Sequence, residues 1–155
     1  MTRTPTQTRR LNRLASFMET LPEKLFDFND YLRLGEKPPM DALEAGGGCG
    51  TTACAVGWAP AVFPTLLKWD MESREVCYRG SKRLDTDYLS RESHKTAMDF
   101  FGLTDGETVY LFTPRRPWQQ DGRLPSDATA KQLAAHIRAF IRDGVPASFT
   151  NAGYF

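Results

Sequence analysis

Apolar residues recur at intervals of three and four along several short stretches of this chain, which is the spacing of one helix face. Near the N-terminus this pattern is formed by Leu11, Leu14, Met18 and Leu21. Thr6 or Thr8 is expected to cap the helix, and Pro22 follows its end. The arginines of this segment are then expected to face solvent.

The second half of the chain has clear start and stop signals. A helix that begins at Ser90 or Ser93 is expected to end at Gly102, because glycine commonly terminates helices. Thr104 and Glu107 have the spacing of a capping box, in which each side chain accepts a hydrogen bond from a free backbone N–H. A further short helix is therefore predicted to begin at this point.

The C-terminal part is predicted to be an amphipathic helix followed by a tail. Its buried stripe is expected to be Leu133, Ile137, Phe140 and Ile141. Its cap is expected to be one of three polar residues, Ser126, Asp127 or Thr129. Gly144 and Pro146 end the pattern, and residues 1–8 and 148–155 are predicted to be flexible tails.

The middle of the chain is less regular. A second short helix is expected to hold the aromatic residues between 26 and 32, and residues 36–50 are expected to be a long loop. The next helix is predicted to begin at Ala53, with Thr51 or Thr52 as its cap, and Pro60 shortens or kinks it. Alternation after residue 73, with Gly80 in a turn, predicts a small β-hairpin near 73–84.

Together these elements predict a mainly α-helical, compact single domain, residues 1–155, built from five or six short helices with one small hairpin. Hydrophobic residues make up 41% of the chain and charged residues 25%, as in ordinary globular proteins. No apolar run approaches the roughly 18 residues of a membrane span, so no membrane contact is expected. The three cysteines and the lack of a secretory signal indicate the cytoplasm.

The net charge of +1 does not favour nucleic acid as a partner. Residues 1–18 carry four arginines and no acid, a composition that is also typical of transit peptides. A solvated first helix is the simpler interpretation, because the apolar spacing continues into an acidic segment. The oligomeric state is left open.

Two cysteines lie in the most unusual stretch, residues 46–58. A cysteine at a helix N-terminus has a lowered pKa, so Cys49 and Cys54 are candidate nucleophiles, with His94 or His136 as a base. The alternative is that both are small buried residues that pack a tight turn. No Cys-x-x-Cys pair is present, so no metal site is predicted, and no cofactor is expected.

The glycines of the same stretch suggest a second kind of site. Backbone amides that precede a helix attract anions, so a nucleotide or another anionic ligand is a candidate here. The candidate ligand-binding residues are Gly48, Gly50, Thr51, Thr52 and Trp58. No lysine follows the glycines, which excludes a P-loop, and a simple linker loop is the alternative.

The run from Cys49 to Ala59 resembles a family of small bacterial and phage proteins with a C-G-T-x-A-C-x-x-G-W-A motif. The resemblance extends to Phe100-Phe101-Gly102-Leu103 and Leu111-Phe112, and it spans roughly residues 10–143. It implies a bacterial or phage setting, but the family has no settled activity that could be carried over.

Two segments suggest a protein partner. Tryptophan and arginine are enriched at interface hot spots, and both occur in residues 113–125, at Arg115, Arg116 and Trp118. Tyr154 and Phe155 form an apolar tail. The leading hypothesis is a non-enzymatic, phage-type protein in the bacterial cytoplasm that binds a host protein or complex, conceivably to inhibit a defence system. The alternatives are a cysteine-dependent hydrolase or transferase and an anionic-ligand binder.

Overall fold

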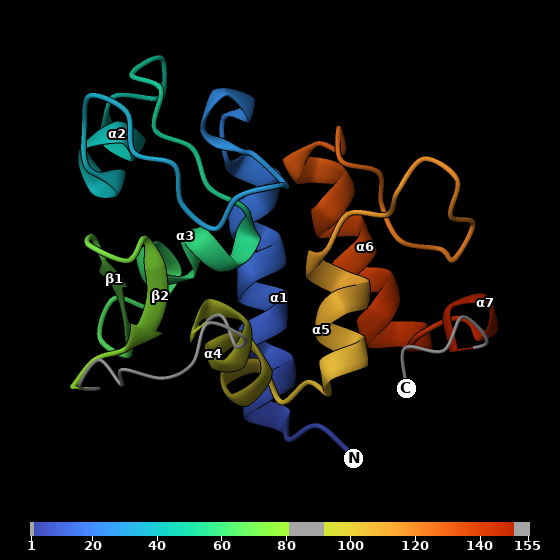
Figure 1. The fold of residues 1–155 in the computed structure, drawn as a ribbon. Helices are drawn as coiled ribbons and strands as arrows, with labels where there is room; N and C mark the ends of the chain where they lie inside the picture. Colours follow the sequence, from blue (N-terminus) through green and yellow to red (C-terminus); the bar gives the residue numbers. More distant parts are fainter. Residues whose placement is uncertain (1, 81–91, 151–155) are drawn as a thin grey trace.

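A computed structural model describes residues 2–80 and 92–150 of the chain. Helix α1 (Pro5–Thr20) runs through the centre of the fold, with its buried stripe at Leu11, Leu14, Ala15 and Met18 (Figure 1). Its cap is Thr4, not Thr6 or Thr8, because Thr4 and Gln7 form a capping box and Pro5 occupies the favoured first position. Residues 5–8, expected to be part of a flexible tail, therefore belong to α1.

One half of the molecule consists of helices packed beside α1. Helix α6 (Ala130–Asp143) runs antiparallel to α1, α4 (Glu92–Phe101) also packs against α1, and α5 (Asp105–Phe112) packs against α4 and α6 (Figure 1). The predicted caps Thr104 and Thr129 are confirmed, each in a capping box. Helix α7 (Ala147–Thr150) places Phe149 fully in the core, within the segment expected to be a tail.

The other half contains α3 (Ala55–Val62) and a hairpin of β1 (Leu67–Asp70) and β2 (Glu75–Tyr78), paired antiparallel with Leu67 opposite Tyr78. The hairpin is confirmed, but its turn lies at residues 71–74 rather than at Gly80. The turn forms there because Asp70 accepts hydrogen bonds from the N–H groups of Glu72 and Ser73. Residues 81–84 of the predicted hairpin lie outside the described residues.

Two further predictions for the middle of the chain are wrong. Residues 26–32 are not a helix; a short 3₁₀ turn, η1 (Glu23–Leu25), leads into an extended residue, Phe26, and then a turn at residues 28–29. The aromatic residues Phe26 and Phe28 lie two positions apart, which is the period of a strand, and their rings stack with centroids 6.3 Å apart. The loop at 36–50 contains a helix, α2 (Pro39–Glu44), which begins at a proline in its first position.

Three of the four arginines of the first segment lie over aromatic rings of the core, whereas Arg9 is exposed as expected. The guanidinium groups of Arg3, Arg10 and Arg13 lie 4.3, 4.0 and 4.8 Å from ring centroids. The rings belong to Phe140, Phe100 and Phe63. In these contacts the long cationic side chains cover aromatic rings of the core. They therefore do not form a continuous cationic stripe on the surface.

The predicted fold class is confirmed: the protein is mainly α-helical, with one small hairpin, in a single compact domain. The described residues hold seven α-helices instead of five or six, because α2 and α7 are too short to show a helical apolar pattern. Within the described ranges, no helix has both the length and the apolar character needed to cross a bilayer.

Candidate functional site

The cysteine-containing stretch folds as a short extended segment held between two others. On one side, Ala53 N–H donates to the Leu25 carbonyl and Asp27 N–H donates to the Ala53 carbonyl. On the other side, Thr52 and Arg33 exchange both backbone hydrogen bonds. We call this arrangement of residues 25–35 around residues 51–54 the clasp. These backbone hydrogen bonds fix the position of residues 51–54 and therefore of the start of the helix that follows them, α3.

Polar side chains in the clasp complete this pairing. Thr51 is buried, accepts a hydrogen bond from the Gly35 N–H and donates one to the Lys37 carbonyl. A Cβ atom on Gly35 would lie 2.2 Å from the Cys49 carbonyl oxygen, so only glycine fits. The Thr51 side chain therefore joins the two ends of the segment of residues 38–50.

The helix after the clasp is seated by a second close approach. A Cβ atom on Gly57 would lie 1.6 Å from the Tyr31 carbonyl oxygen, so α3 lies directly against the backbone of the clasp. Trp58 is 0% exposed and donates its indole N–H to the Leu25 carbonyl at 2.9 Å. It has no free face on which a nucleotide base could stack.

The glycine run ends α2 and does not lead into α3. Gly46 N–H donates to the Leu43 carbonyl and Gly47 N–H donates to the Ala42 carbonyl, which is the Schellman pattern of a helix C-terminus. Gly46, the residue after the cap Ala45, has the positive φ that this exit requires. The residue that caps α3 is Cys54, not Thr51 or Thr52.

This placement bears on the predicted anion cradle. Helix α3 begins at Ala55, well after the glycines, so its N-terminal amides do not belong to the glycine run. The N–H groups of Thr52, Ala53 and Cys54 donate to protein carbonyls. Ligand binding at Gly48, Gly50, Thr51 and Thr52 stays a prediction, with fewer free amides than the sequence indicated.

The candidate nucleophiles differ in environment. Cys54 is buried, and burial raises the pKa of its thiol to about 11, against the opposing effect of backbone hydrogen bonds from Gly57 and Val56. Cys49 is half-buried, and a hydrogen bond from the backbone of Thr51 lowers the pKa of its thiol. Of the two, Cys49 has the greater thiolate character.

The histidines are engaged away from the cysteines. His94 Nε2 lies 2.8 Å from an Asp105 carboxylate oxygen, between α4 and α5. His136 Nε2 lies 3.2 Å from the Tyr110 carbonyl oxygen, and burial lowers the pKa of this imidazole. In the described part of the chain, no three His, Cys, Asp or Glu residues are grouped as metal ligands.

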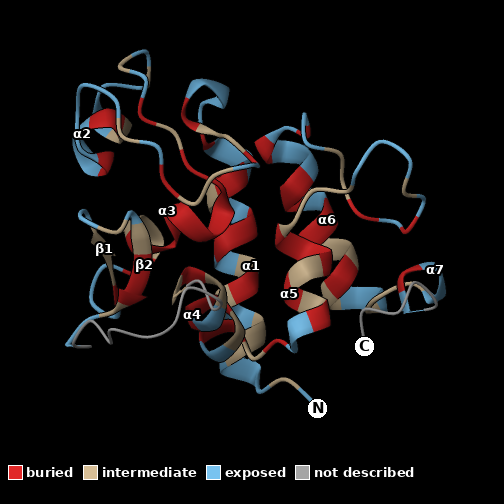
Figure 2. Cartoon of the chain, in the orientation of Figure 1, coloured by how far each residue is buried: buried red, intermediate tan, exposed pale blue. Residues whose placement is uncertain are grey.

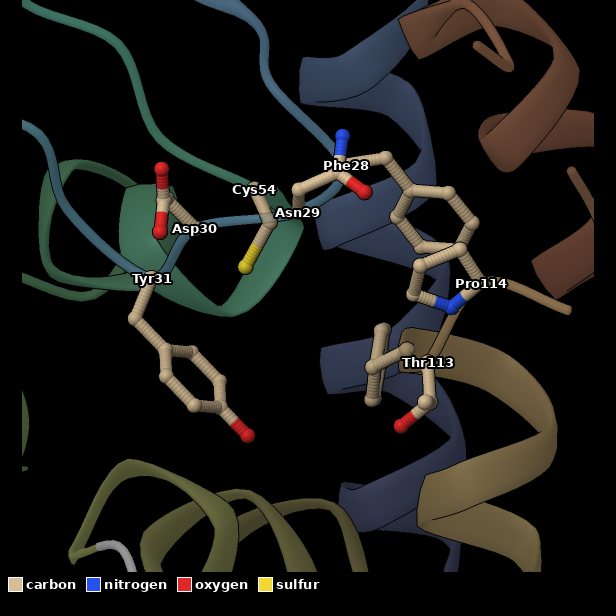
Figure 3. A pocket seen from close by; sticks show the side chains of 8 residues that line it. Phe28, Asn29, Asp30, Tyr31, Cys54, Thr113 and Pro114 are labelled. Atoms are coloured by element: carbon tan, nitrogen blue, oxygen red, sulfur yellow. The ribbon is translucent and has the colours of Figure 1, made fainter. Parts of the chain in front are cut away.

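A small pocket lies beside Cys54. Figure 3 shows the thiol of Cys54 at the top of a space between Tyr31 and the pair Thr113 and Pro114, with the ring of Phe28 on the side of Pro114. The pocket holds about 90 Å³. Sites for drug-sized ligands typically hold roughly 300–1,000 Å³, so a nucleotide does not fit this pocket as it stands.

The second candidate region is the segment of residues 113–125, which we call the tip loop. It projects from the side of the molecule opposite α2, and Figure 2 shows its outer part exposed. At its base, Arg115 N–H donates to the Leu124 carbonyl at 2.8 Å. This bond closes the loop where it leaves and re-enters the helical half.

Gln119 holds the interior of the tip loop together. Its backbone N–H donates to the Arg116 carbonyl and its own carbonyl accepts a hydrogen bond from the Arg115 guanidinium. Its side-chain oxygen accepts hydrogen bonds from the Arg116 N–H and the Arg123 guanidinium. One amide side chain thus fixes both arms of the loop.

A buried ion pair anchors the returning arm of the loop. The Asp121 and Arg123 side chains are 5% and 4% exposed, and their closest atoms lie 2.8 Å apart. Burial alone would raise the pKa of Asp121, but the hydrogen bonds and charge of Arg123 outweigh it and hold this pKa below its usual value. The Arg123 guanidinium also lies 5.7 Å from the ring centroid of Phe149, which ties the loop to α7.

The outermost side chains of the tip loop, at residues 116–118, are exposed. Trp118 is 72% exposed, the highest value among the exposed large hydrophobic residues of the described structure. The Arg116 guanidinium lies over its indole, 5.6 Å from the ring centroid. Of the predicted partner residues, Arg116 and Trp118 are thus brought together, and Arg115 instead donates to the Gln119 carbonyl. Tyr154 and Phe155 lie outside the described residues.

The supporting residues of the tip loop were not identified from the sequence. Phe149 carries no local signal, since it acts on the loop through Arg123, a distant residue. The partners of Gln119 all lie within four residues of it, but its residue type alone does not mark this role. The charged pair Asp121 and Arg123 on either side of a glycine was a usable signal, because side chains two positions apart across a turn can meet.

Comparisons with models of known protein families, with curated proteins and with solved structures find no match for this chain.

Proposed function

We propose that this chain is a non-enzymatic binding protein that docks on a host macromolecule through the tip loop. The observation that carries the proposal is an indole 72% exposed on a loop whose backbone is already fixed by internal hydrogen bonds. Tryptophan and arginine dominate the energetics of protein interfaces. A loop fixed before binding loses little conformational entropy when it docks.

The proposal extends to a setting. The resemblance of residues 49–59 to small bacterial and phage proteins supports a phage-type protein that acts in the bacterial cytoplasm, and inhibition of a host defence complex is one such role. The candidate nucleophiles have no histidine partner within hydrogen-bond reach in the described structure, which favours binding over catalysis.

The test is an affinity pull-down from bacterial lysate with the tagged full chain. The double variant Trp118→Ala with Arg116→Ala removes the exposed group, and Met40→Ala, 43% exposed on α2, is the matched control. We expect a stoichiometric partner that the control retains and the double variant loses. A partner that all three proteins retain would show that the tip loop is not the docking site.

A second candidate function is thiol chemistry at Cys49, favoured by its half-buried position and lowered pKa. Alkylation by iodoacetamide below pH 8, followed by peptide mass spectrometry, tests it. The expectation is that Cys49 reacts in the native protein while Cys54, with its pKa raised to about 11, does not. Equal resistance of both thiols would remove this candidate.

A further inference from the structure

We infer, on the basis of the function proposed above, that the tip loop docks on a protein surface where a carboxylate lies beside an apolar pocket. The indole of Trp118 would enter the pocket and the guanidinium of Arg116 would pair with the carboxylate. This assigns a chemical class to the partner.

The charge of the outer loop supports the carboxylate. Residues 113–120 contain two arginines and no acid. Arg115 directs its guanidinium inward, to the Gln119 carbonyl at 3.2 Å, and the acid that follows, Asp121, is occupied by Arg123. Arg116 is exposed and forms no ion pair among the described residues, so its planar fork of donors is open to an incoming carboxylate.

The position of the indole supports the apolar pocket. Arg116 lies over one face of the Trp118 ring, which leaves the remaining surface of the ring for a partner. A large aromatic side chain gains most of its binding energy when it is fully desolvated in a pocket at the centre of an interface. The cation that covers one face then lies at the rim of the same pocket, beside the proposed carboxylate.

A protein fits these observations better than a nucleic acid. Strands of nucleic acid are held by grooves with many cations that neutralise successive phosphates. Three of the N-terminal arginines are instead placed over aromatic rings of the core, and the tip loop offers Arg116 as its unpaired outward cation within the described structure. If a nucleic acid base stacked on Trp118, few cations would be near enough to bind the phosphates of its strand.

The experiment selects peptides from a random displayed library on the immobilised full chain, with counter-selection on Trp118→Ala. Enriched peptides are then measured by fluorescence anisotropy against the wild type, Arg116→Ala and Arg116→Lys at low and high salt. A single-stranded dT20 oligonucleotide is a second probe.

The inference predicts peptides that combine Asp or Glu with a cluster of apolar residues. Their affinity should fall about tenfold in Arg116→Ala, since a charge-assisted hydrogen bond is lost, and should fall with salt. Arg116→Lys should restore part of the loss, because the charge remains but the fork does not.

Several results would overturn the inference: enriched peptides without acids, no peptide that separates wild type from Trp118→Ala, or dT20 binding that requires Trp118. A lysate partner lost in the double variant, combined with peptides that lack acids, would retain the proposed function and reject this inference alone.

Discussion

Two tryptophans mark two regions of this molecule that use the same side chain in opposite ways. Trp58 follows the clasp, is 0% exposed and donates its indole N–H to the Leu25 carbonyl. Trp118 lies on the tip loop and is 72% exposed. Both regions fix their backbone by hydrogen bonds between irregular segments rather than by long helices or strands.

The difference in exposure separates residues that stabilise the fold from residues that have no structural role within the chain. In the clasp, Thr51, Gly57 and Trp58 are each explained by a packing contact or a hydrogen bond within the chain. In the tip loop the buried pair and Gln119 have such an explanation, but Trp118 does not. An exposed tryptophan beside an arginine has the composition of an interface hot spot.

The largest loss of stability is expected from a substitution that disrupts the contact between α3 and the clasp. Gly57→Ala places a Cβ atom 1.6 Å from the Tyr31 carbonyl oxygen, so α3 must move away from the clasp. We expect the free energy of unfolding to fall by about 4 kcal/mol or more, measured by urea denaturation.

The control for this variant is Gly46→Ala. Gly46 has φ +74° but no atom within 4 Å of its added Cβ, so the cost is backbone strain alone, about 1 kcal/mol. If both variants lost the same stability, the close approach of α3 would not matter.

The next largest loss of stability is expected from a substitution in the buried ion pair that supports the tip loop. Asp121→Asn removes one charge of a buried ion pair and should lower the free energy of unfolding by about 3 kcal/mol. Because the folded-state pKa of Asp121 is lowered, its contribution is present above the unfolded pKa and is lost as the pH falls through the folded value.

Urea unfolding of the wild type and Asp121→Asn between pH 3 and 7 tests both points. The two stabilities should converge at the acid end. A constant difference across this range would mean that the carboxylate charge does not stabilise the loop.

A smaller effect is expected from Trp58→Phe. The indole hydrogen bond to Leu25 is lost and a small cavity remains, while Ala53 still donates to the same carbonyl. We expect a loss of about 2–3 kcal/mol in the urea-derived free energy of unfolding. A loss below 0.5 kcal/mol would contradict the view that Trp58 is a core residue.

The comparison also shows what the sequence could predict. The stripes of α1 and α6 and the caps Thr104 and Thr129 were predictable, because helix spacing and caps are set by residues a few positions apart. The apolar spacing predicted the helical half of the fold well for this reason.

The clasp was not predictable in the same way. Residues 26–32 read as a helix, yet the Asp27 N–H donates to the Ala53 carbonyl and the Asp30 carbonyl accepts from the Cys54 N–H, and this distant pairing overrides local propensity. The glycine run was assigned to the start of the next helix because the helix that it ends, α2, has only six residues and therefore shows no helical spacing of apolar residues. In the tip loop, the exposed residues were identified, but the buried support from α7 was not.

Acid should lower the free energy of unfolding of the domain through His136 on α6. His136 is buried, its ring packs on Tyr110 with centroids 4.6 Å apart, and burial lowers its pKa from the ordinary 6.5. The unfolded chain therefore binds a proton near pH 6.5 that the folded chain refuses until lower pH, so stability falls as the pH drops from 7 towards 5.

His136→Gln removes this dependence and is the comparison variant in urea unfolding at a series of pH values. We expect the wild type to lose stability faster than the variant on acidification below pH 6.5. Parallel profiles would show that His136 titrates alike in the folded and unfolded chains.

The smallest expected effect is the one that most sharpens the contrast between the two tryptophans. Trp118→Ala should change the free energy of unfolding by less than about 0.5 kcal/mol, since the indole is 72% exposed and contacts chiefly Arg116. The same variant should lose the binding partner, whereas Trp58→Phe should lose stability and retain the partner in the fraction that is folded. A Trp118→Ala protein as unstable as Trp58→Phe would mean that both rings serve the fold, and the exposed indole would no longer argue for docking.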